Sequence, residues 1–326
     1  MKANVFMILA AGLLLGACSN DNEPTDNANG VAAVFTTNLD GRVQTRMADD
    51  KWAEDDAIGI FSLNDEMDGV MIDDVEQSNN AVNLKYTRTP ANAWDGGTTA
   101  FRFKNPADAT VTFKAYYPYT ADADIMDGAG GKKDGTIAFD ATDQSLAGQA
   151  KFDFLFADKD KDGNAPAGSK NSPNVNFQFV HSMTKIIIVL QADGSSVTDL
   201  GTMVPTLKGL KAKGTFGLAN GVAALAGDAA IVDLLLSNQT ETANTATKQS
   251  FVTIVPPQMA STDVYLTIAS GNDSYLSARI LSKKELEAGN CYTVTVTVKK
   301  RELVVESSDI TPWAPENGGN SDAILQ

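Results

Sequence analysis

The sequence predicts an all-β protein of two tandem β-sandwich domains. Short runs of β-branched and aromatic residues alternate with clusters of Gly, Asp, Asn and Pro along most of the chain, which is the pattern of a β-sandwich. The chain has 326 residues, a length that suits two domains of ordinary size. Helical segments are few, and one or two turns are expected over 283–288, before Gly289. Sheets therefore have to supply most of the regular structure.

The N-terminus predicts export and lipid attachment. Residues 5–15 form an apolar run, about half of the roughly 20 residues that a membrane-spanning helix needs. Leu15-Gly16-Ala17-Cys18 ends this run and is similar to the lipobox of bacterial lipoproteins, in which the cysteine is acylated and becomes the mature N-terminus. We therefore interpret 1–17 as a lipoprotein signal peptide and Cys18 as the lipidation site, so the protein is anchored to the membrane and does not span it. An ordinary secretory peptide with an incidental cysteine is the alternative.

Charge and cysteine content narrow the function classes. The formal net charge is −15, which disfavours a nucleic-acid partner. Cys18 and Cys291 are the two cysteines, so acylation of Cys18 leaves no disulfide within the chain. Cys291 is expected to be a buried thiol. The fold must then be stabilised by burial of apolar surface, which a 43% hydrophobic composition supplies.

The expected strands fall into two sets, which follow a polar tether over 19–30 that is too hydrophilic to fold by itself. The first set comprises 57–62, 81–86, 100–104, 110–117, 136–139 and 152–157. The second set comprises 175–190, 207–218, 230–236, 251–255, 264–269, 275–281 and 291–298. Between them, 158–173 is rich in Asp, Lys, Gly and Pro, as domain boundaries are. We therefore assign 18–46 to the lipidated tether and a removable first strand, 47–170 to the N-terminal sandwich, and 171–326 to the C-terminal sandwich.

Two runs predict how strands are buried. Residues 291–298 alternate, with Tyr and Val on one face and Thr on the other, so one face is expected in the core and one in water. The run 185–190 is apolar after Lys185, which predicts a strand covered on both faces. Its β-branched side chains disfavour a buried helix.

The sequence predicts no catalytic residue, no metal site and no cofactor. His181 is the only histidine, so a multi-histidine metal site is impossible and a Ser-His-Asp site would have to use this residue. Its place beside an apolar strand favours a half-buried histidine with satisfied hydrogen bonds. Residues 158–163 have the acidic residues and the sixth glycine of an EF-hand loop, but Ser169 stands where a bidentate Glu is required. A solvated acidic loop is favoured, and weak calcium binding is the alternative.

Trp52, Trp94 and Trp313 raise a second function class, a surface-anchored, non-polymerising glycan-binding lipoprotein. Trp94 is the best placed of the three for ligand contact, because it lies in a polar turn over 90–97 where a ring could be exposed. Packing of Trp94 against its own sheet is the alternative. Trp52 is expected in the core.

Several segments occur in the order found in one known family. They are Thr45-Arg46 with Trp52-Ala53-Glu54-Asp55-Asp56-Ala57-Ile58-Gly59-Ile60-Phe61, then Tyr116-Tyr117-Pro118-Tyr119, Asp153-Phe154-Leu155-Phe156-Ala157, Phe177-Gln178-Phe179-Val180-His181-Ser182-Met183-Thr184-Lys185-Ile186, Pro257-Gln258 and Ala288-Gly289-Asn290-Cys291-Tyr292-Thr293-Val294. Together they resemble the fimbrillin family, the type V pilins of Bacteroidota, from about 45 to 298. The resemblance implies two transthyretin-like β-sandwiches, made as a lipoprotein precursor and carried to the surface of the outer membrane.

The resemblance also implies a structural and adhesive function without catalysis. The partners that it implies are other fimbrial subunits in a head-to-tail polymer, an Arg-specific protease, and ligands on host or bacterial surfaces. It leaves open whether the subunit belongs to the stalk, the tip or the anchor of a fimbrium, or does not polymerise.

Assembly in this family follows cleavage by a trypsin-like, Arg-specific protease, and Arg46 is the matching position in this chain. The residues support this role independently, because 31–36 is a plausible first strand between the lipid and Arg46. Cleavage would release that strand and leave an apolar groove with unpaired backbone groups, which favours pairing with a strand of another chain. A solvated loop arginine is the alternative for Arg46.

The C-terminus offers a candidate donor for the groove. After the charged block 299–302, β-prone sequence resumes with Leu303, Val305 and Ile310 as apolar positions. A head-to-tail contact of this kind does not close, so it would produce filaments. The alternative is that this segment pairs within its own domain and that the remainder is a frayed tail.

Overall fold

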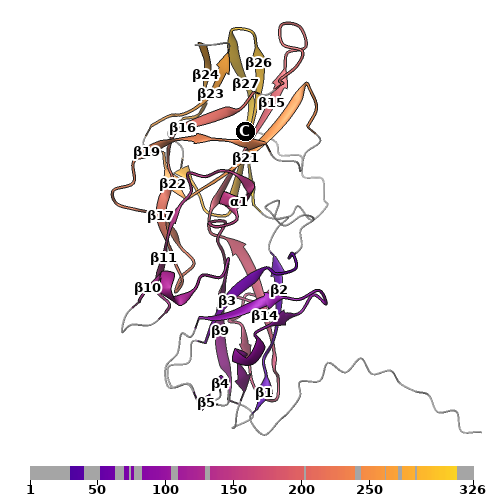
Figure 1. Cartoon of the computed structure of the whole chain (residues 1–326), viewed down its shortest axis with the longest axis vertical. Coiled ribbons are helices and arrows are strands. Elements are labelled where there is room, and N and C mark those ends of the chain that lie inside the picture. Colours follow the sequence, from indigo (N-terminus) through magenta and orange to yellow (C-terminus); the bar gives the residue numbers. More distant parts are fainter. Residues whose placement is uncertain are drawn as a thin grey trace, which may run out of the picture.

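The structure is a computed structural model that describes residues 30–39, 52–62, 70–72, 75–76, 83–103, 109–128, 133–201, 203–238, 244–260, 262–270, 274–282 and 285–313. Strands form nearly all of its regular structure, and the α-helix α1 (Leu146–Gln149) has four residues. Figure 1 shows an elongated molecule with a sandwich toward each end of the long axis and a smaller sheet between them. The predicted all-β fold class is confirmed.

The N-terminal sandwich has a larger sheet of order β2-β14-β12-β9-β3-β6-β7, with β13 paired to β9, and a smaller sheet of order β1-β8-β4-β5. The larger sheet comprises β2 (Val34–Leu39), β3 (Ala57–Ser62), β6 (Leu84–Arg88), β7 (Trp94–Asp95), β9 (Val111–Tyr117), β12 (Leu155–Ala157), β13 (Ala167–Gly168) and β14 (Asn174–His181). The smaller sheet comprises β1 (Val31–Ala32), β4 (Val70–Ile72), β5 (Val75–Glu76) and β8 (Arg102–Phe103). Their shared core is rich in aromatic side chains.

The C-terminal sandwich has one sheet of order β20-β21-β15-β26-β27 and one of order β19-β16-β23-β24, beside the pair β22-β25. The first sheet comprises β15 (Thr184–Ala192), β20 (Ser237–Asn238), β21 (Lys248–Val255), β26 (Asn290–Lys299) and β27 (Glu302–Pro312). The second comprises β16 (Pro205–Lys211), β19 (Ile231–Leu235), β23 (Val264–Ser270) and β24 (Ser274–Leu281). The pair comprises β22 (Gln258–Met259) and β25 (Glu285–Leu286).

A smaller sheet of order β10-β11-β17-β18 joins the two halves of the chain. It comprises β10 (Ile125–Met126), β11 (Thr136–Asp140), β17 (Lys213–Gly217) and β18 (Ala223–Leu225). β11 and β17 pair antiparallel, from Thr136 opposite Gly217 to Asp140 opposite Lys213. Phe216 of β17 stacks on Phe154, with ring centroids 4.3 Å apart. The two halves therefore share one hydrophobic core.

Side-chain amides beside α1 strengthen this junction. Gln144 Nε2 donates to the carbonyl of Ile254, and Gln144 Oε1 accepts from the Ile254 N–H, each at 2.9 Å. Gln149 Nε2 donates to the carbonyl of Val252 at 2.9 Å. The two amides thus satisfy backbone groups along β21, which would be costly to bury without partners.

The structure corrects two expected strands that were too long. The run 175–190 is divided between β14 and β15, which lie in different sandwiches, and the Ser182 N–H between them donates to the carbonyl of Phe154. The run 207–218 is divided between β16 and β17, again in different sheets. Strand propensity continues across both divisions, so the sequence carries no sign of the change of sheet.

Sheet membership also differs from the expected boundary at 170. β14 begins at Asn174, yet it pairs with β12 and β2 of the N-terminal sandwich. β11 precedes the boundary, yet it pairs with β17 of the second half. The polar segment 158–173 is thus a connection within the first sandwich. The helix expected over 283–288 is also wrong, since Glu285–Leu286 is strand β25, paired with β22.

Burial along β26 and β15 follows the sequence pattern in part. On β26, Tyr292 and the valines are buried while the threonines are half-buried, as alternation predicts. On β15, Ile186, Ile188 and Leu190 are fully buried, but Ile187 and Val189 are only half-buried. The expected coverage of both faces of β15 is therefore wrong for the outer face, because one sheet faces the core on one side only.

Candidate functional site

The first strand of the chain lies where the sequence places it and covers the N-terminal core. β1 pairs antiparallel with β8, and β2 pairs parallel with β14 at the edge of the larger sheet. The chain changes sheet at Ala33, whose N–H donates to the carbonyl of Phe101. Val31, Ala33 and Phe35 are buried, whereas Val34 is exposed. Residues 31–36 are therefore strand structure with one apolar row directed into the core.

Phe35 is the main anchor of this segment. Its ring is 3% exposed and lies 4.9 Å from the ring centroid of Tyr86, 5.3 Å from Phe113 and 5.6 Å from Phe177. Tyr86 fixes one wall of this aromatic cage, because its hydroxyl accepts the N–H of Phe101 at 2.7 Å. Burial raises the pKa of Tyr86 far above its usual range, so the hydroxyl stays protonated. Removal of Phe35 would leave a pocket walled by aromatic rings.

Trp94 lies under the first strand and is not exposed to ligand. Its ring is 8% exposed and packs edge-on against Trp52, with centroids 5.1 Å apart. Its Nε1–H donates to Thr37 Oγ1 on β2 at 3.0 Å. The expectation of a ligand contact at Trp94 is wrong, because the pairing of β7 with β6 turns the indole toward the core. The packing alternative holds.

A hollow of about 450 Å³ lies next to Trp94 on the outer side of the β6–β7 hairpin. Asp55, Lys85, Arg88 and Asp95 line it together with threonines and glycines, and none of its lining residues is aromatic. Trp52 is buried against Trp94, and Trp313 is buried against His181. The three tryptophans therefore form no common sugar-stacking platform.

The C-terminal segment is an edge strand of its own sandwich. β27 pairs antiparallel with β26 along its whole length, and a bulge at Glu306 interrupts the register. Before the bulge, Leu303 is buried and Val305 packs partly against the core. From the bulge onward, Glu306 to Pro312 are all exposed, and Ile310 is 43% exposed. β27 thus has a half that belongs to the core and a half held mainly by backbone pairing.

The exposed half of β27 ends at a buried cluster between the two sandwiches. Trp313 stacks on His181 with ring centroids 3.6 Å apart and planes 7° apart. Lys185 Nζ lies 5.5 Å from the Trp313 ring, and His181 Nδ1 lies 3.2 Å from Asp153 Oδ1. Among the described residues, nothing bonds to His181 Nε2, so the His-Asp pair has no nucleophile beside it. The histidine is buried and not half-buried as expected, and among the described residues only one of its two ring nitrogens has a partner.

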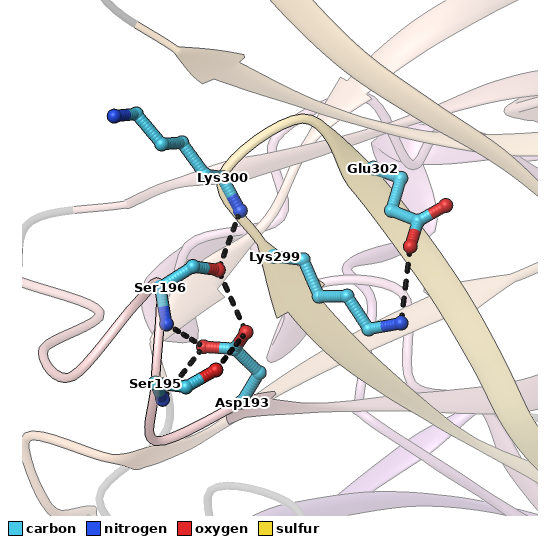
Figure 2. Close-up of polar contacts among 6 residues, drawn as sticks. All are labelled: Asp193, Ser195, Ser196, Lys299, Lys300 and Glu302. Atoms are coloured by element: carbon cyan, nitrogen blue, oxygen red, sulfur yellow. Dashed lines mark hydrogen bonds and ion pairs between the residues drawn. The ribbon is translucent and has the colours of Figure 1, made fainter.

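The far end of β27 is fixed by a polar turn, which Figure 2 shows. The Asp193 carboxylate accepts from the hydroxyls and backbone N–H groups of Ser195 and Ser196. These bonds, above all the one from the Ser196 hydroxyl, hold the pKa of Asp193 well below its usual range. Ser196 Oγ also accepts the N–H of Lys300, while Lys299 pairs with Glu302 at 3.0 Å. The β26–β27 turn is therefore tied to the loop after β15.

The acidic loop after β12 is a set of turns. Asp160 Oδ1 accepts the N–H groups of Asp162 and Asn164, and Lys161 pairs with Asp162. Within the described ranges, no three His, Cys, Asp or Glu side chains are placed to hold a metal ion. Asp160 thus accepts hydrogen bonds from backbone N–H groups of its own loop, in agreement with a solvated loop.

Two predicted sites, Cys18 and Arg46, lie outside the described residues. Arg46 falls between β2, which ends at Leu39, and Trp52 in the core of the same sandwich. In the part of the chain that the structure describes, no helix has the length and apolarity of a membrane span.

Comparison with known proteins identifies the family. The family model for fimbrillin-like proteins matches residues 45–313. The chain belongs to the fimbrillin-like family. A candidate fimbrium subunit of Bacteroides uniformis, Fim1C, is similar to this fimbrillin-like chain, with 29% identity over 335 residues that cover 98% of this chain and 97% of the relative. The sequence resemblance to fimbrillins is confirmed.

Solved structures share the fold of this fimbrillin-like chain. A candidate cell adhesion protein from Bacteroides uniformis is 22% identical with a TM-score of 0.62, and covers 87% of this chain and 99% of its own. Another from Bacteroides ovatus is 24% identical with a TM-score of 0.59, and covers 88% of this chain and 99% of its own. The fold therefore extends over nearly the whole of both relatives.

The aromatic cage gives a direct prediction for Phe35. Phe35→Ala should lower the free energy of unfolding by about 3–5 kcal/mol, because it removes a buried ring and leaves a cavity. Val34→Ala, at the exposed neighbouring position, should change it by less than about 0.5 kcal/mol. Urea unfolding followed by tryptophan fluorescence measures both. Equal effects of the two substitutions would show that the first strand is not anchored through Phe35.

Proposed function

We propose that this chain is a fimbrial subunit, exported as a lipoprotein precursor, matured by Arg-specific proteolysis after Arg46 and assembled by donor-strand exchange. Membership of the fimbrillin-like family supports the fimbrial and adhesive class and a location in a surface fimbrium. The observation that carries the exchange mechanism is the first strand. It precedes Arg46, lies at a sheet edge, and fills an aromatic cage through one side chain, Phe35.

Loss of β1 and β2 would create an apolar groove that favours binding of another strand. The backbone edge of β14 would lose six paired positions, from Asn174 to Phe179. The cage around Phe35 would open to water, and burial of one Phe side chain is worth about 1.5–3 kcal/mol. An unpaired strand edge beside an apolar groove is a template for a strand of another chain. Cleavage would thus convert a stable monomer into a subunit that gains free energy by association.

The C-terminal segment with Leu303, Val305 and Ile310 is the proposed donor. In Ser308-Asp309-Ile310, a small residue and a large apolar residue flank an exposed one. Ala33 and Phe35 flank the exposed Val34 in the same way in the first strand. Ile310 would then enter the cage that Phe35 leaves. Its present exposure means that the home sandwich loses little when Ile310 departs. Because the donor and the groove lie on different sandwiches of one chain, the contact is heterologous and produces a head-to-tail filament.

Lipidation at Cys18 and surface display complete the proposal. The lipid anchor would hold the precursor at the outer membrane until cleavage after Arg46 separates the folded chain from it. Other fimbrial subunits and an Arg-specific protease are then the partners, and ligands on host or bacterial surfaces are the targets of adhesion. A structural function of this kind needs no catalytic residue and no cofactor.

Cleavage after Arg46 should make the groove measurable. Trypsin treatment of the folded precursor should cut first after Arg46 or Arg42, and the product should begin at Met47 or Val43. Removal of the first strand should shift tryptophan emission to longer wavelength, because Trp94 loses Thr37 and the cover of β2. Arg46→Ala is the control. If this substitution leaves processing and fimbriae unchanged in native cells, Arg46 is a solvated loop residue.

Ile310→Asp should prevent assembly of the cleaved protein, with roughly tenfold or greater loss of filaments, because its carboxylate would have no partner in an apolar cage. Thr311→Asp is the matched control, since Thr311 is exposed on the opposite face of β27. Size-exclusion chromatography and electron microscopy measure the filaments, and circular dichroism checks the fold. Normal filaments from the Ile310→Asp protein would contradict the assignment of Ile310 as a donor residue.

Cys18→Ala should abolish incorporation of labelled palmitate and move the protein from the membrane to the soluble fraction, because the apolar run is too short to span. Fractionation of cells grown with the label measures both. Label on the Cys18→Ala protein would contradict lipidation at this cysteine.

A further inference from the structure

The exposed half of β27 is held at its end by a single apolar side chain. From Glu306 to Pro312 every residue is exposed, and the next residue, Trp313, is buried. The Trp313 N–H donates to the carbonyl of Gly289, whose own N–H donates to the carbonyl of Met183. The end of β27 is thus bonded to the segment that connects the two sandwiches.

The contacts of Trp313 cross the domain junction. His181, on which it stacks, ends β14 of the N-terminal sandwich, and Asp153, which pairs with His181, precedes β12. Lys185, the second residue of β15, lies over the indole ring at 5.5 Å and is itself buried. The indole thus lies against an imidazole and near an ammonium group. A cation near the face of an electron-rich indole ring is attracted to it.

The cluster is also poised to open. Trp313 Nε1 and His181 Nε2 are both buried without a hydrogen-bond partner among the described residues. Burial of polar atoms without partners is unfavourable, and water would satisfy both atoms if the indole moved out. Stacking and apolar burial therefore stabilise the closed state, whereas the two unpartnered ring nitrogens destabilise it.

We propose that the stack of Trp313 on His181 is a latch that keeps the C-terminal strand closed on its own sandwich, and that release of Trp313 frees the segment after Glu306 for a second copy of the chain. The second part rests on the proposed donor function. The latch regulates assembly because the segment after Glu306, which carries Ile310, has no buried side chain other than Trp313 among its described residues, so the availability of this segment follows the position of one indole.

Cys291 provides a probe of the latch. It lies on β26 opposite Thr311 and is paired with Lys185 of β15, and it belongs to the same hydrophobic core as Trp313. Burial raises the pKa of its thiol, although the charge of Lys185 opposes this, so the closed state contains little thiolate at neutral pH. A full chain with Cys18→Ser has Cys291 as its sole thiol. The rate at which a maleimide labels that thiol then reports how often the end of β27 opens.

In this background, Trp313→Ala should raise the labelling rate at least tenfold under native conditions. Ser307→Ala, at an exposed position of the same strand, should change the rate less than twofold. His181→Phe, which keeps a ring for stacking, should stay within threefold of the parent, whereas His181→Ala should resemble Trp313→Ala. The dependence of the rate on low concentrations of urea distinguishes opening of β27, which is shallow, from global unfolding, which is steep.

A labelling rate for Trp313→Ala within twofold of the parent would overturn the latch, as would a steep urea dependence in the parent protein. Assembly of Arg46-cleaved protein tests the second part, and Trp313→Ala should shorten the lag before filaments form. Faster labelling without a shorter lag would overturn regulation by the latch, provided that truncation after Glu306 abolishes filaments. If the truncated protein also forms filaments, the donor function fails and the labelling result for the latch stands.

Discussion

The antiparallel pairing of β11 with β17 is the contact on which the rest of the structure depends. These strands come from different halves of the chain, and each is short. In their sheet, Phe216 of β17 stacks on Phe154, and both rings belong to the core that continues into the C-terminal sandwich. With the Gln144 and Gln149 amides bonded to β21, this sheet makes the two sandwiches parts of a single body. Forces applied at one end are thus transmitted through packed side chains and not through a linker.

The two termini of the described chain form sheet edges, but they are held by different means. β2 contributes a large ring to an aromatic core and a hydroxyl to Trp94, so side chains fix it in place. β27 contributes chiefly backbone pairing after its bulge, and side chains hold it only near its ends. Removal of β2 therefore damages the sandwich that it leaves, whereas removal of the outer half of β27 does not. This asymmetry is the physical basis of the opposite roles that we propose for them, as lost strand and as donor.

The local pattern of the sequence was sufficient to predict strands that stay within one sheet along their whole length. The run 57–62 is β3, and the alternation of 291–298 reports the buried and half-buried faces of β26. It failed at 175–190 and 207–218, since β propensity does not change where a strand leaves one sheet for another. Trp94 shows a related limit. A polar turn surrounds it in sequence, but its burial is decided by Thr37 and Trp52, which are distant along the chain. The Trp313 cluster likewise brings together three segments that are distant in sequence, around 153, 181–185 and 313, so no spacing could reveal it.

The parallel alignment of β2 with β14 has a kinetic consequence. A parallel edge strand has no hairpin turn to its neighbour, so its covalent tie on the C-terminal side is the connection through 40–51. While that connection is intact, β2 is present at the high effective concentration of a tethered ligand. After the proposed cleavage it would become a separate peptide in a bimolecular equilibrium, and dilution would make its departure practically irreversible. Its off-rate, set by the Phe35 cage, would then time how long a cleaved subunit remains a monomer.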